Sequence, residues 1–234
     1  MINRPIQFIF AFLSLFFLVV SCEKDTADVN GVTYPSVVTA RSLETRGAVR
    51  MFTKDGEVTD EASIARFIAG GGIHEPNIFE ESFESHPDSK ITFHSKDSLT
   101  FADEILKFGI TETQEGKFMI SRDFRSEVIT QPPYIMSVIE DLWRMGIHRS
   151  PLEKILQSNG FFFTGKEYRV GYGSFKSFKL PVLLFKLKRQ SSVEESKSMR
   201  MNLGNRFDEF DEDFISTLAN EDTLAIQQHY VLFE

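Results

Sequence analysis

Histidine and carboxylate side chains are the first candidates for chemistry in this chain. His74, His86 and His94 lie within 21 residues of one another, and Glu75 and Asp88 flank two of them. Zinc is held by three or four convergent ligands, often two of them on one helix or hairpin. The spacing of these histidines matches no metal motif, so we expect loop and surface histidines. We predict no metal and no cofactor.

A second group of candidate residues is acidic. The segment NRFDEFDED places five carboxylates within residues 208–213, which is dense enough to suggest calcium binding. An EF-hand loop needs a glycine at its sixth place and a glutamate at its twelfth, and neither fits. We therefore predict a solvated acidic loop. Paired carboxylates for glycoside hydrolysis stay open, because such partners meet only in space.

Two further motifs are not supported. The triple glycine at residues 70–72 follows a predicted helix, and no Lys-Ser or Lys-Thr pair comes after it, so it is interpreted as a helix end and not as a phosphate loop. No Gly-x-Ser-x-Gly sequence is present, which removes support for the common serine-hydrolase layout. We predict no catalytic residues.

One basic stretch contrasts with the acidity of the chain. Residues 166–189 contain seven basic side chains and a single acid, Glu167, interleaved with aromatic residues. Such a hairpin could contact an anionic glycan or lipid headgroups. The alternative is an exposed strand face on which lysine prevents edge pairing. The candidate contact residues are Lys166, Arg169, Lys176, Lys179, Lys186, Lys188 and Arg189.

The only thiol of the chain, Cys22, follows an apolar run. Arg4 gives the start of the chain one positive charge, and the thirteen residues from Phe8 to Val20 contain Ser14 as their only polar residue. A positive start, an apolar run of this length and a small residue before the break are typical of a secretory signal peptide. The run is too short to span a bilayer comfortably, since ~20 apolar residues are needed.

The tetrapeptide VVSC at residues 19–22 resembles the lipobox of bacterial lipoproteins. This resemblance implies a signal peptide at residues 1–21, cleavage after Ser21, and a lipid on Cys22 that anchors the protein to a membrane. Two or more acyl chains hold a protein there stably. The alternatives are an ordinary signal peptide with an incidental cysteine, or an uncleaved helical anchor.

The residues after the cysteine bear on localisation. Glu23-Lys24-Asp25 is similar to the short lysine-and-acid signal that sends some Bacteroidota lipoproteins to the cell surface. We therefore expect the protein in the cell envelope, at the outer membrane. The periplasmic and the surface-exposed leaflet both stay open.

The composition limits the partners. The net charge is −8, or −9 once the predicted signal with its single charge is removed, which argues against general nucleic-acid binding. With Cys22 lipidated, neither a disulfide nor thiol catalysis is available, so a hydrophobic core must provide the stability. Phenylalanine occurs 24 times, five of them in the signal. This abundance predicts aromatic filling of a core or an aromatic-lined apolar cavity.

Apolar and polar residues alternate over much of the chain. Residues 90–101 and 106–120 show period-two alternation broken by polar turns, which predicts antiparallel hairpins with one face on a core. Further strands are predicted near residues 48–52, 167–172 and 179–189, with Pro181 placing the last of these at an edge or at its first residue. Residues 213–218 and 223–233 are predicted to form a closing hairpin.

Helical spacing occurs in two regions. Thr59 is the predicted start of a helix over residues 60–69, because acids follow it and glycines end the pattern. Residues 132–158 also break the strand pattern. There we predict a short helical insertion, whose second part starts at Pro151.

These elements predict a mainly β fold, an antiparallel meander closing into a barrel or a sandwich. We expect a flexible tether at residues 22–46, within which a short strand around Ser36 to Leu43 stays open, and a single β-rich domain at residues 47–234. The order of elements from about residue 47 resembles the lipocalin-like domains of Bacteroidota lipoproteins.

Three function classes follow. We expect a non-catalytic protein that binds a small apolar or amphipathic ligand inside an aromatic-rich barrel. The alternatives are an interaction or structural module that docks on an envelope protein assembly, and a carboxylate-based enzyme acting on envelope glycans. A hollow interior would favour the binder, a solid core the interaction module, and carboxylates converging in an open cleft the enzyme.

Overall fold

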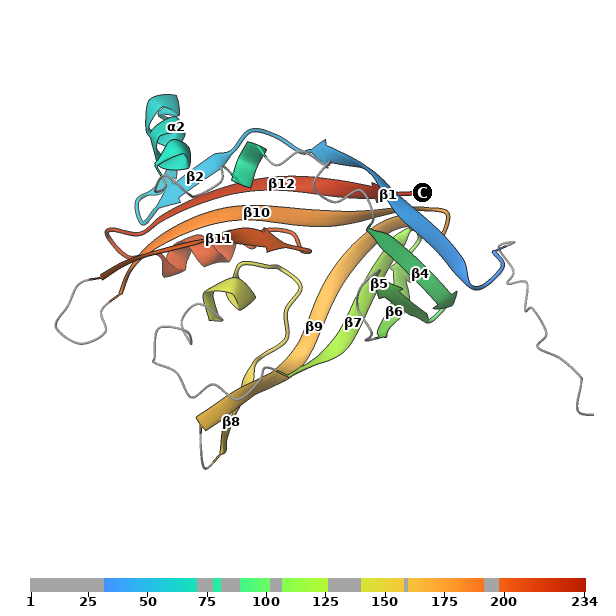
Figure 1. The fold of residues 1–234 in the computed structure, drawn as a ribbon. Helices are drawn as coiled ribbons and strands as arrows, with labels where there is room; N and C mark the ends of the chain where they lie inside the picture. Colours follow the sequence, from blue (N-terminus) through green and yellow to red (C-terminus); the bar gives the residue numbers. More distant parts are fainter. Residues whose placement is uncertain are drawn as a thin grey trace, which may run out of the picture.

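The computed structural model describes residues 32–70, 78–80, 89–101, 107–125, 140–157, 160–191 and 198–234 (Figure 1). The predicted signal peptide, Cys22 and the first part of the predicted tether lie outside these ranges. Strands dominate the described chain, and its helices are short. None of these helices is long and apolar enough to cross a membrane.

Eight strands form a closed antiparallel barrel. The ring runs β10–β9–β7–β6–β5–β4–β1–β12 and closes because β12 also pairs with β10. The predicted fold class, a mainly β meander that closes into a barrel, is confirmed. The ring strands are β1 (Ser36–Thr45), β4 (Lys90–Ser95), β5 (Ser98–Phe101), β6 (Phe108–Gln114), β7 (Lys117–Arg125), β9 (Gly160–Ser174), β10 (Ser177–Ser191) and β12 (Thr223–Phe233).

The barrel hairpins follow the alternation of the sequence. In β4, Ile91 and Phe93 are buried, and in β5 the buried Leu99 pairs with Phe93. In β6, Phe108 and Ile110 are buried between exposed neighbours. Gly116 adopts a φ of +69° in the turn to β7, which a glycine does without strain. One face of each strand thus packs on the core and the other faces solvent.

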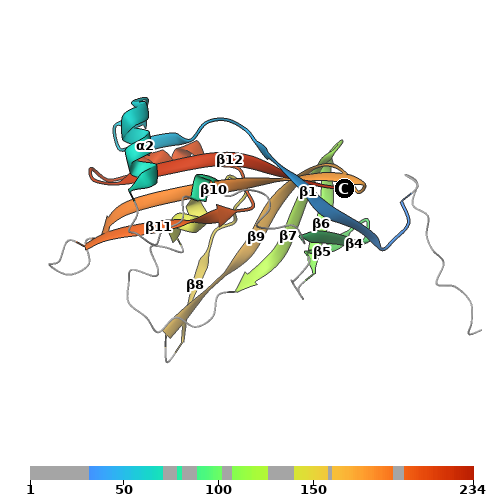
Figure 2. The same cartoon turned by 45° about the horizontal axis from the view of Figure 1, so that its top comes forward.

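Two groups of strands extend beyond the ring in different directions (Figures 1 and 2). The strands β11 (Ser198–Arg206), β2 (Arg50–Thr53) and β3 (Gly56–Val58) widen the sheet of β10 and β12, and we call this sheet the β10 arm. The strand β8 (Glu153–Gln157) pairs with β9, and together with β7 they form the β9 arm. Only Ser177–Lys179 of β10 pair with β9, and beyond them the two strands separate.

Pro181 lies inside β10, which begins at Ser177 and has partners on both sides, so both predicted placements, an edge strand and the first residue of a strand, are wrong. One side of β10 pairs with β9 up to Lys179 and with β11 from Leu183 onward. Pro181 falls in the interval between these two partners, where a residue without an N–H group is tolerated. Residues 180–187 are all buried, because β10 is covered on both faces.

The predicted helix over residues 60–69 is confirmed as α2 (Glu61–Ala69). Asp60 is its N-cap in place of the predicted Thr59, since its carboxylate accepts a hydrogen bond of 2.8 Å from the Ser63 N–H. The short predicted insertion contains a helix at residues 140–144. Two 3₁₀ helices, η1 (Ile78–Glu80) and η3 (Glu212–Thr217), complete the described elements outside the strands.

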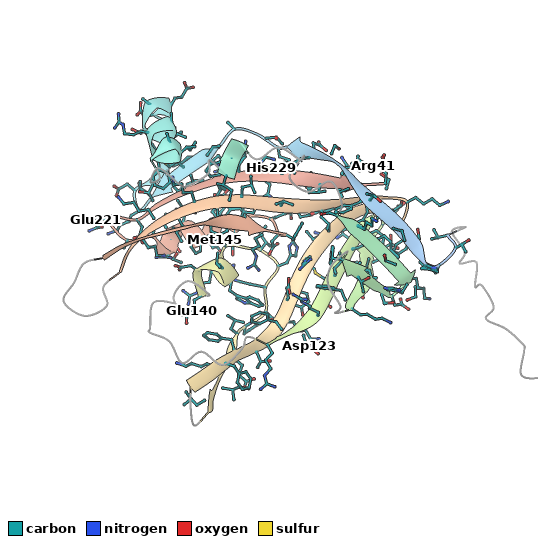
Figure 3. All side chains as sticks on the ribbon, in the orientation of Figure 1. Arg41, Asp123, Glu140, Met145, Glu221 and His229 are labelled. Carbon is teal, nitrogen blue, oxygen red and sulfur yellow. The ribbon has the colours of Figure 1, made fainter. Side chains whose placement is uncertain are left out.

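Two large hydrophobic clusters lie on different parts of the molecule. The first fills the barrel ring and includes Phe93, Phe118 and Phe178. The second lies against the β10 arm, where Leu183, Phe185 and Leu187 pack on Met145 and on η3. Figure 3 shows Met145 between the short helix and the β10 arm. The second cluster fixes the position of the residues that enter the space between the two arms.

Three segments differ from the prediction. The strand β1 pairs with β4 and β12, so the domain begins before residue 47 and the tether is shorter than residues 22–46. Residues 153–157 form β8 and not a helix, because they pair with Gly160–Thr164 of β9. Residues 212–217 form η3 and not the first strand of a closing hairpin, because Asp211 caps a helical turn there.

Candidate functional site

The interior of the barrel is packed with aromatic rings. Phe178 is fully buried, and its ring centroid lies 5.5 Å from that of Phe93 and 5.6 Å from that of Phe118. Gly171 faces the same ring so closely that an added Cβ would lie 2.0 Å from Phe178 Cζ. The part of the interior formed by the described residues is therefore a filled core. The predicted ligand space inside the barrel is not found there.

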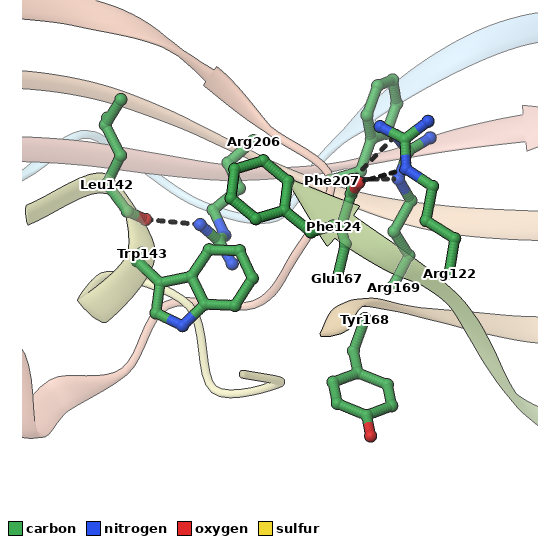
Figure 4. Close-up of a pocket in the computed structure, with 9 residues that line it drawn as sticks. All are labelled: Arg122, Phe124, Leu142, Trp143, Glu167, Tyr168, Arg169, Arg206 and Phe207. Carbon is green, nitrogen blue, oxygen red and sulfur yellow. Dashed lines mark hydrogen bonds and ion pairs between the residues drawn. The ribbon is translucent and has the colours of Figure 1, made fainter. Parts of the chain in front are cut away.

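A cavity of about 400 Å³ lies outside this core, where β9 and β10 separate (Figure 4). We call it the wedge pocket. Its walls come from β7 and β9 of the β9 arm, from the short helix and from the end of β11. The lining residues are Arg122, Phe124, Leu142, Trp143, Glu167, Tyr168, Arg169, Arg206 and Phe207.

An arginine–glutamate–arginine triad forms the inner end of the wedge pocket. Arg122 Nε lies 2.6 Å from Glu167 Oε2, and Arg169 Nη2 lies 2.9 Å from Glu167 Oε1. The Arg169 guanidinium also stacks over the rings of Phe101 and Phe108, at 4.4 and 4.7 Å from their centroids. The triad therefore closes the apolar core on one side and faces the pocket on the other.

The triad holds Glu167 in its charged form. Burial raises the pKa of this carboxyl, but the charges and hydrogen bonds of Arg169 and Arg122 outweigh burial, and the pKa is lowered overall. Both carboxylate oxygens accept hydrogen bonds from guanidinium groups. Glu167 is therefore a structural anion, and a carboxyl held this way is a poor proton donor near neutral pH.

Aromatic rings form the outer wall. Phe124 and Trp143 lie with their ring centroids 5.3 Å apart and an interplanar angle of 36°. Trp143 Nε1 donates a hydrogen bond of 2.5 Å to the Ser150 carbonyl, which fixes the orientation of the indole. Phe207 completes the wall and stacks on Phe101 at 6.3 Å. These rings give the pocket an apolar surface beside its arginines.

Arg206 is the third arginine of the wedge pocket. Its Nη1 donates a hydrogen bond of 2.5 Å to the Leu142 carbonyl, and its Nε lies 3.4 Å from Asp208 Oδ2. Burial lowers the pKa of this guanidinium, although the charge of Asp208 acts in the opposite direction. No hydrogen-bond partner for Nη2 is found among the described residues. Arg206 is thus held in a fixed orientation with one donor group left over.

Asp208 holds the Arg206 guanidinium through an ion pair. Its carboxylate is fully buried and also binds His148 Nδ1 at 2.9 Å and the Glu209 N–H at 2.8 Å. Gly146 packs directly on it, since an added Cβ would lie 2.0 Å from Asp208 Oδ2. The predicted solvated acidic loop is therefore wrong at this residue, because its carboxylate orders the loop from inside. Among the described residues no group of acids and histidines could hold a metal ion.

The chain was also compared with known proteins. No protein-family model, no curated protein and no solved structure matches it. The functional argument therefore rests on the geometry of the wedge pocket.

The seven basic residues predicted as one anionic-surface contact do not form one surface. Arg169 belongs to the wedge pocket, and Lys186 is buried, where its Nζ donates to the carbonyls of Ile68 and Gly70 at the end of α2. Arg189 forms ion pairs with Asp141 and Asp222. The reason is that six of the seven lie on β9 and β10, which diverge, and Lys176 lies in the turn between these strands. Lys179 pairs with Glu44, Lys166 and Lys176 are exposed, and Lys188 is half-buried.

The described histidines have protein partners. His94 Nε2 contacts Thr100 Oγ1 at 3.0 Å on the barrel surface. His229 is buried in β12, where Nδ1 contacts Thr45 Oγ1 at 3.2 Å, and burial lowers the pKa of its imidazole. His74 and His86 lie outside the described residues.

The sequence analysis missed Arg122 and Arg206. The signal for Arg122 was present in β7, where Phe118 and Ile120 define the inward phase and Arg122 continues it. A charged residue at an inward position of an alternating strand indicates a polar partner inside the barrel wall. For Arg206 the sequence holds no comparable signal, because its partners come from the loop and helix around residues 142–148.

Proposed function

We propose that this protein is a lipid-anchored lipoprotein of the cell envelope that binds an amphipathic small molecule in the wedge pocket without changing it chemically. The observation that supports binding is the pocket itself. Its volume of about 400 Å³ lies within the ~300–1,000 Å³ typical of small-molecule sites. It also combines an aromatic wall with a few fixed polar groups, as such sites do.

The lining residues favour binding over catalysis. They include no serine, cysteine, histidine or lysine, which are the common nucleophiles and proton carriers. Glycoside hydrolysis needs two carboxyl groups flanking the bond, one of them able to donate a proton. Among the described residues that line the wedge pocket, Glu167 is the one carboxylate, and two arginines hold it as an anion.

The anchor rests on the residues at the start of the chain. The apolar run that ends in VVSC at residues 19–22 supports lipidation of Cys22 and attachment to the outer membrane, in either leaflet. Replacing Cys22 by serine is expected to abolish incorporation of labelled fatty acid and to release the protein from the membrane fraction. Label retained on the Cys22→Ser protein would contradict the anchor.

Ligand binding has a built-in reporter, because Trp143 is the only tryptophan of the chain and lines the wedge pocket. Saturable changes in tryptophan emission on titration with ten-carbon amphiphiles, below their micelle concentrations, are expected if the pocket binds them. Leu142→Phe would add a ring to the pocket wall and weaken binding. Leu156→Phe is the matched control, since Leu156 is 76% exposed on β8. Equal binding by both variants would contradict the wedge pocket as the site.

A second candidate function is docking on an envelope protein assembly. The observation that favours it is the β9 arm, where β8 pairs with β9 alone among the described strands and presents Leu156 to solvent. An apolar side chain on an open strand edge suits a protein partner. A photo-crosslinking residue at position 156, tested in cells, would distinguish the candidates. Crosslinks there to one envelope protein would favour docking.

A further inference from the structure

Resting on the proposed function, we propose that the wedge pocket selects ligands with an anionic head group, a carboxylate or a phosphate ester, on an apolar body. Arg206 is the residue that binds the head group. Phe124 and Trp143 pack against the body.

The charge of the lining is the first reason. Three arginines and one glutamate line the pocket, although the whole chain carries a net charge of −8. Glu167 pairs with both Arg122 and Arg169, and Arg206 contacts Asp208, which does not line the pocket. An anion entering the pocket meets three guanidinium groups in a partly enclosed space, where charges interact more strongly than in bulk water.

The hydrogen-bonding character of the lining is the second reason. A guanidinium has five N–H donors and no acceptor. The acceptor atoms of Glu167 are already bonded to Arg122 and Arg169. The charged groups of the pocket therefore offer a ligand donors, and a head group made of acceptors fits them. Carboxylates and phosphates are the acceptors that arginine binds most strongly.

The surroundings of Arg206 single it out among the three arginines. Its Nε and Nη1 are held by Asp208 and by the Leu142 carbonyl, which fixes the plane of the guanidinium. The contact with Asp208 Oδ2 is long, at 3.4 Å, and the other oxygen, Oδ1, accepts from the Glu209 N–H and contacts His148 Nδ1. Arg206 is thus a half-buried cation whose guanidinium plane is fixed and whose Nη2 has no hydrogen-bond partner among the described residues, so Nη2 is available to an anionic ligand.

The position of the aromatic rings explains why an anion without an apolar body should bind only weakly. The Arg206 guanidinium lies 5.6 Å from the Trp143 ring centroid, and Trp143 stacks on Phe124. A head group on Arg206 therefore places the adjoining part of the ligand against these two rings. Apolar contact with the rings and the charge-assisted hydrogen bonds then act on one molecule.

A head-group series tests the proposal on the full chain without its signal. Decanoate and decyl phosphate carry the anion and the chain, decanol the chain alone, and inorganic phosphate the anion alone. We expect both anionic amphiphiles to bind at least tenfold more tightly than decanol, since hydrogen bonds to a charged group are stronger than those between neutral groups. Inorganic phosphate should bind weakly. Trp143 emission and calorimetry provide two independent measurements.

Two arginine variants locate the head group. Arg206→Gln should remove most of the preference for decanoate over decanol and leave decanol binding unchanged. Arg144→Gln is the matched control, because Arg144 is exposed, follows Trp143 directly and does not line the wedge pocket. The control should keep the full preference.

Each outcome decides between the proposals. Equal affinities for decanoate and decanol would overturn the anion preference and leave the proposed binding function standing. No binding by any amphiphile would overturn the proposed function itself. Loss of the preference in Arg144→Gln, or its retention in Arg206→Gln, would overturn the assignment to Arg206. If Arg206→Gln fails to fold, the head-group series on the unaltered protein still decides the charge question.

Discussion

The barrel interior and the wedge pocket are built from the same residue type and behave differently. Both contain phenylalanines on strands of the same sheet. Inside the ring, Phe93 and Phe118 both pack on Phe178 and leave no room even beside Gly171. In the wedge, Phe124 and Trp143 pack on each other and line a cavity where β9 and β10 have separated. Strand pairing therefore decides whether an aromatic residue fills a core or lines a cavity.

The largest effect is expected in the barrel interior. Phe178→Ala should lower the free energy of unfolding by about 3–5 kcal/mol, because it removes a fully buried ring and leaves a cavity. Urea unfolding measures this loss. Decanoate binding by the folded fraction should stay unchanged, since Phe178 does not line the wedge pocket. A loss below ~1 kcal/mol would mean that the interior is not the tightly packed region.

The support beneath the wedge is expected to be almost as sensitive. Asp208→Ala should cost about 3 kcal/mol of stability, because it leaves Arg206 and His148 without their buried carboxylate partner. Asp213→Ala, an exposed acid of the same segment, should change stability by less than ~0.5 kcal/mol. Urea unfolding of the pair compares them directly. Similar values for both variants would contradict the structural role of Asp208.

The wedge wall is expected to affect binding more than folding. Phe124→Ala should cost only about 1 kcal/mol of stability, because the ring is half-buried. It should weaken decanoate binding by about tenfold, through the lost contact with the ligand body. Calorimetric titration and urea unfolding of the same preparation check both numbers. A cost as large as that of Phe178→Ala would remove the contrast between the two regions.

On acidification, the barrel wall and the wedge pocket should lose stability over different pH ranges. Burial lowers the pKa of His229 in the barrel wall, so below pH ~6.5 the unfolded chain binds a proton that the folded barrel excludes. Stability is therefore lost as the pH falls from there toward the folded pKa. For Glu167, burial raises the pKa, but Arg169 and Arg122 lower it further. Its contribution is present above pH ~4.3 and is lost as the pH falls through its folded pKa.

Two variants assign these pH windows. His229→Gln should flatten the stability profile only in the upper window, and Glu167→Gln only in the lower one. Urea unfolding at a series of pH values measures both profiles. An unchanged upper window in His229→Gln would assign that titration to another group.

Local pattern predicted the parts of the fold that form between neighbours in the sequence. The hairpins at residues 90–101 and 108–125 follow alternation and a polar turn, and both are present. The sequence pattern predicted the wrong secondary structure where pairing with a strand distant in the sequence determines it. The stretch 151–158 has Leu152, Ile155 and Leu156 at helical spacing, yet residues 153–157 form β8 because β9 offers an edge. The sequence pattern assigns residues 36–45 to the tether and leaves a short strand open, and pairing with β4 and β12 makes them a ring strand.

The wedge pocket was harder to predict for the same reason. Arg122, Arg169 and Arg206 lie on three strands, and their common position depends on where β9 leaves β10. In the sequence, Arg169 lies within the basic stretch at residues 166–189, whereas Arg122 and Arg206 lie far outside it. The basic stretch therefore indicated an anionic contact for the wrong set of residues. Only the tertiary structure shows that Arg169 lines the pocket, whereas Lys186 is buried and donates hydrogen bonds to carbonyls at the end of α2.

The pairing of β1 with β12 has a consequence for how the chain reaches its folded state. Thr45 on β1 meets His229 on β12 across 184 residues of sequence, and Thr39 and Glu234 exchange both backbone hydrogen bonds. Contacts of such long range form slowly, because loop-closure entropy must be overcome before they stabilise the chain. The ring cannot close until its last strand has been synthesised. Until then the chain stays open, which is the state that the export proposed above would require.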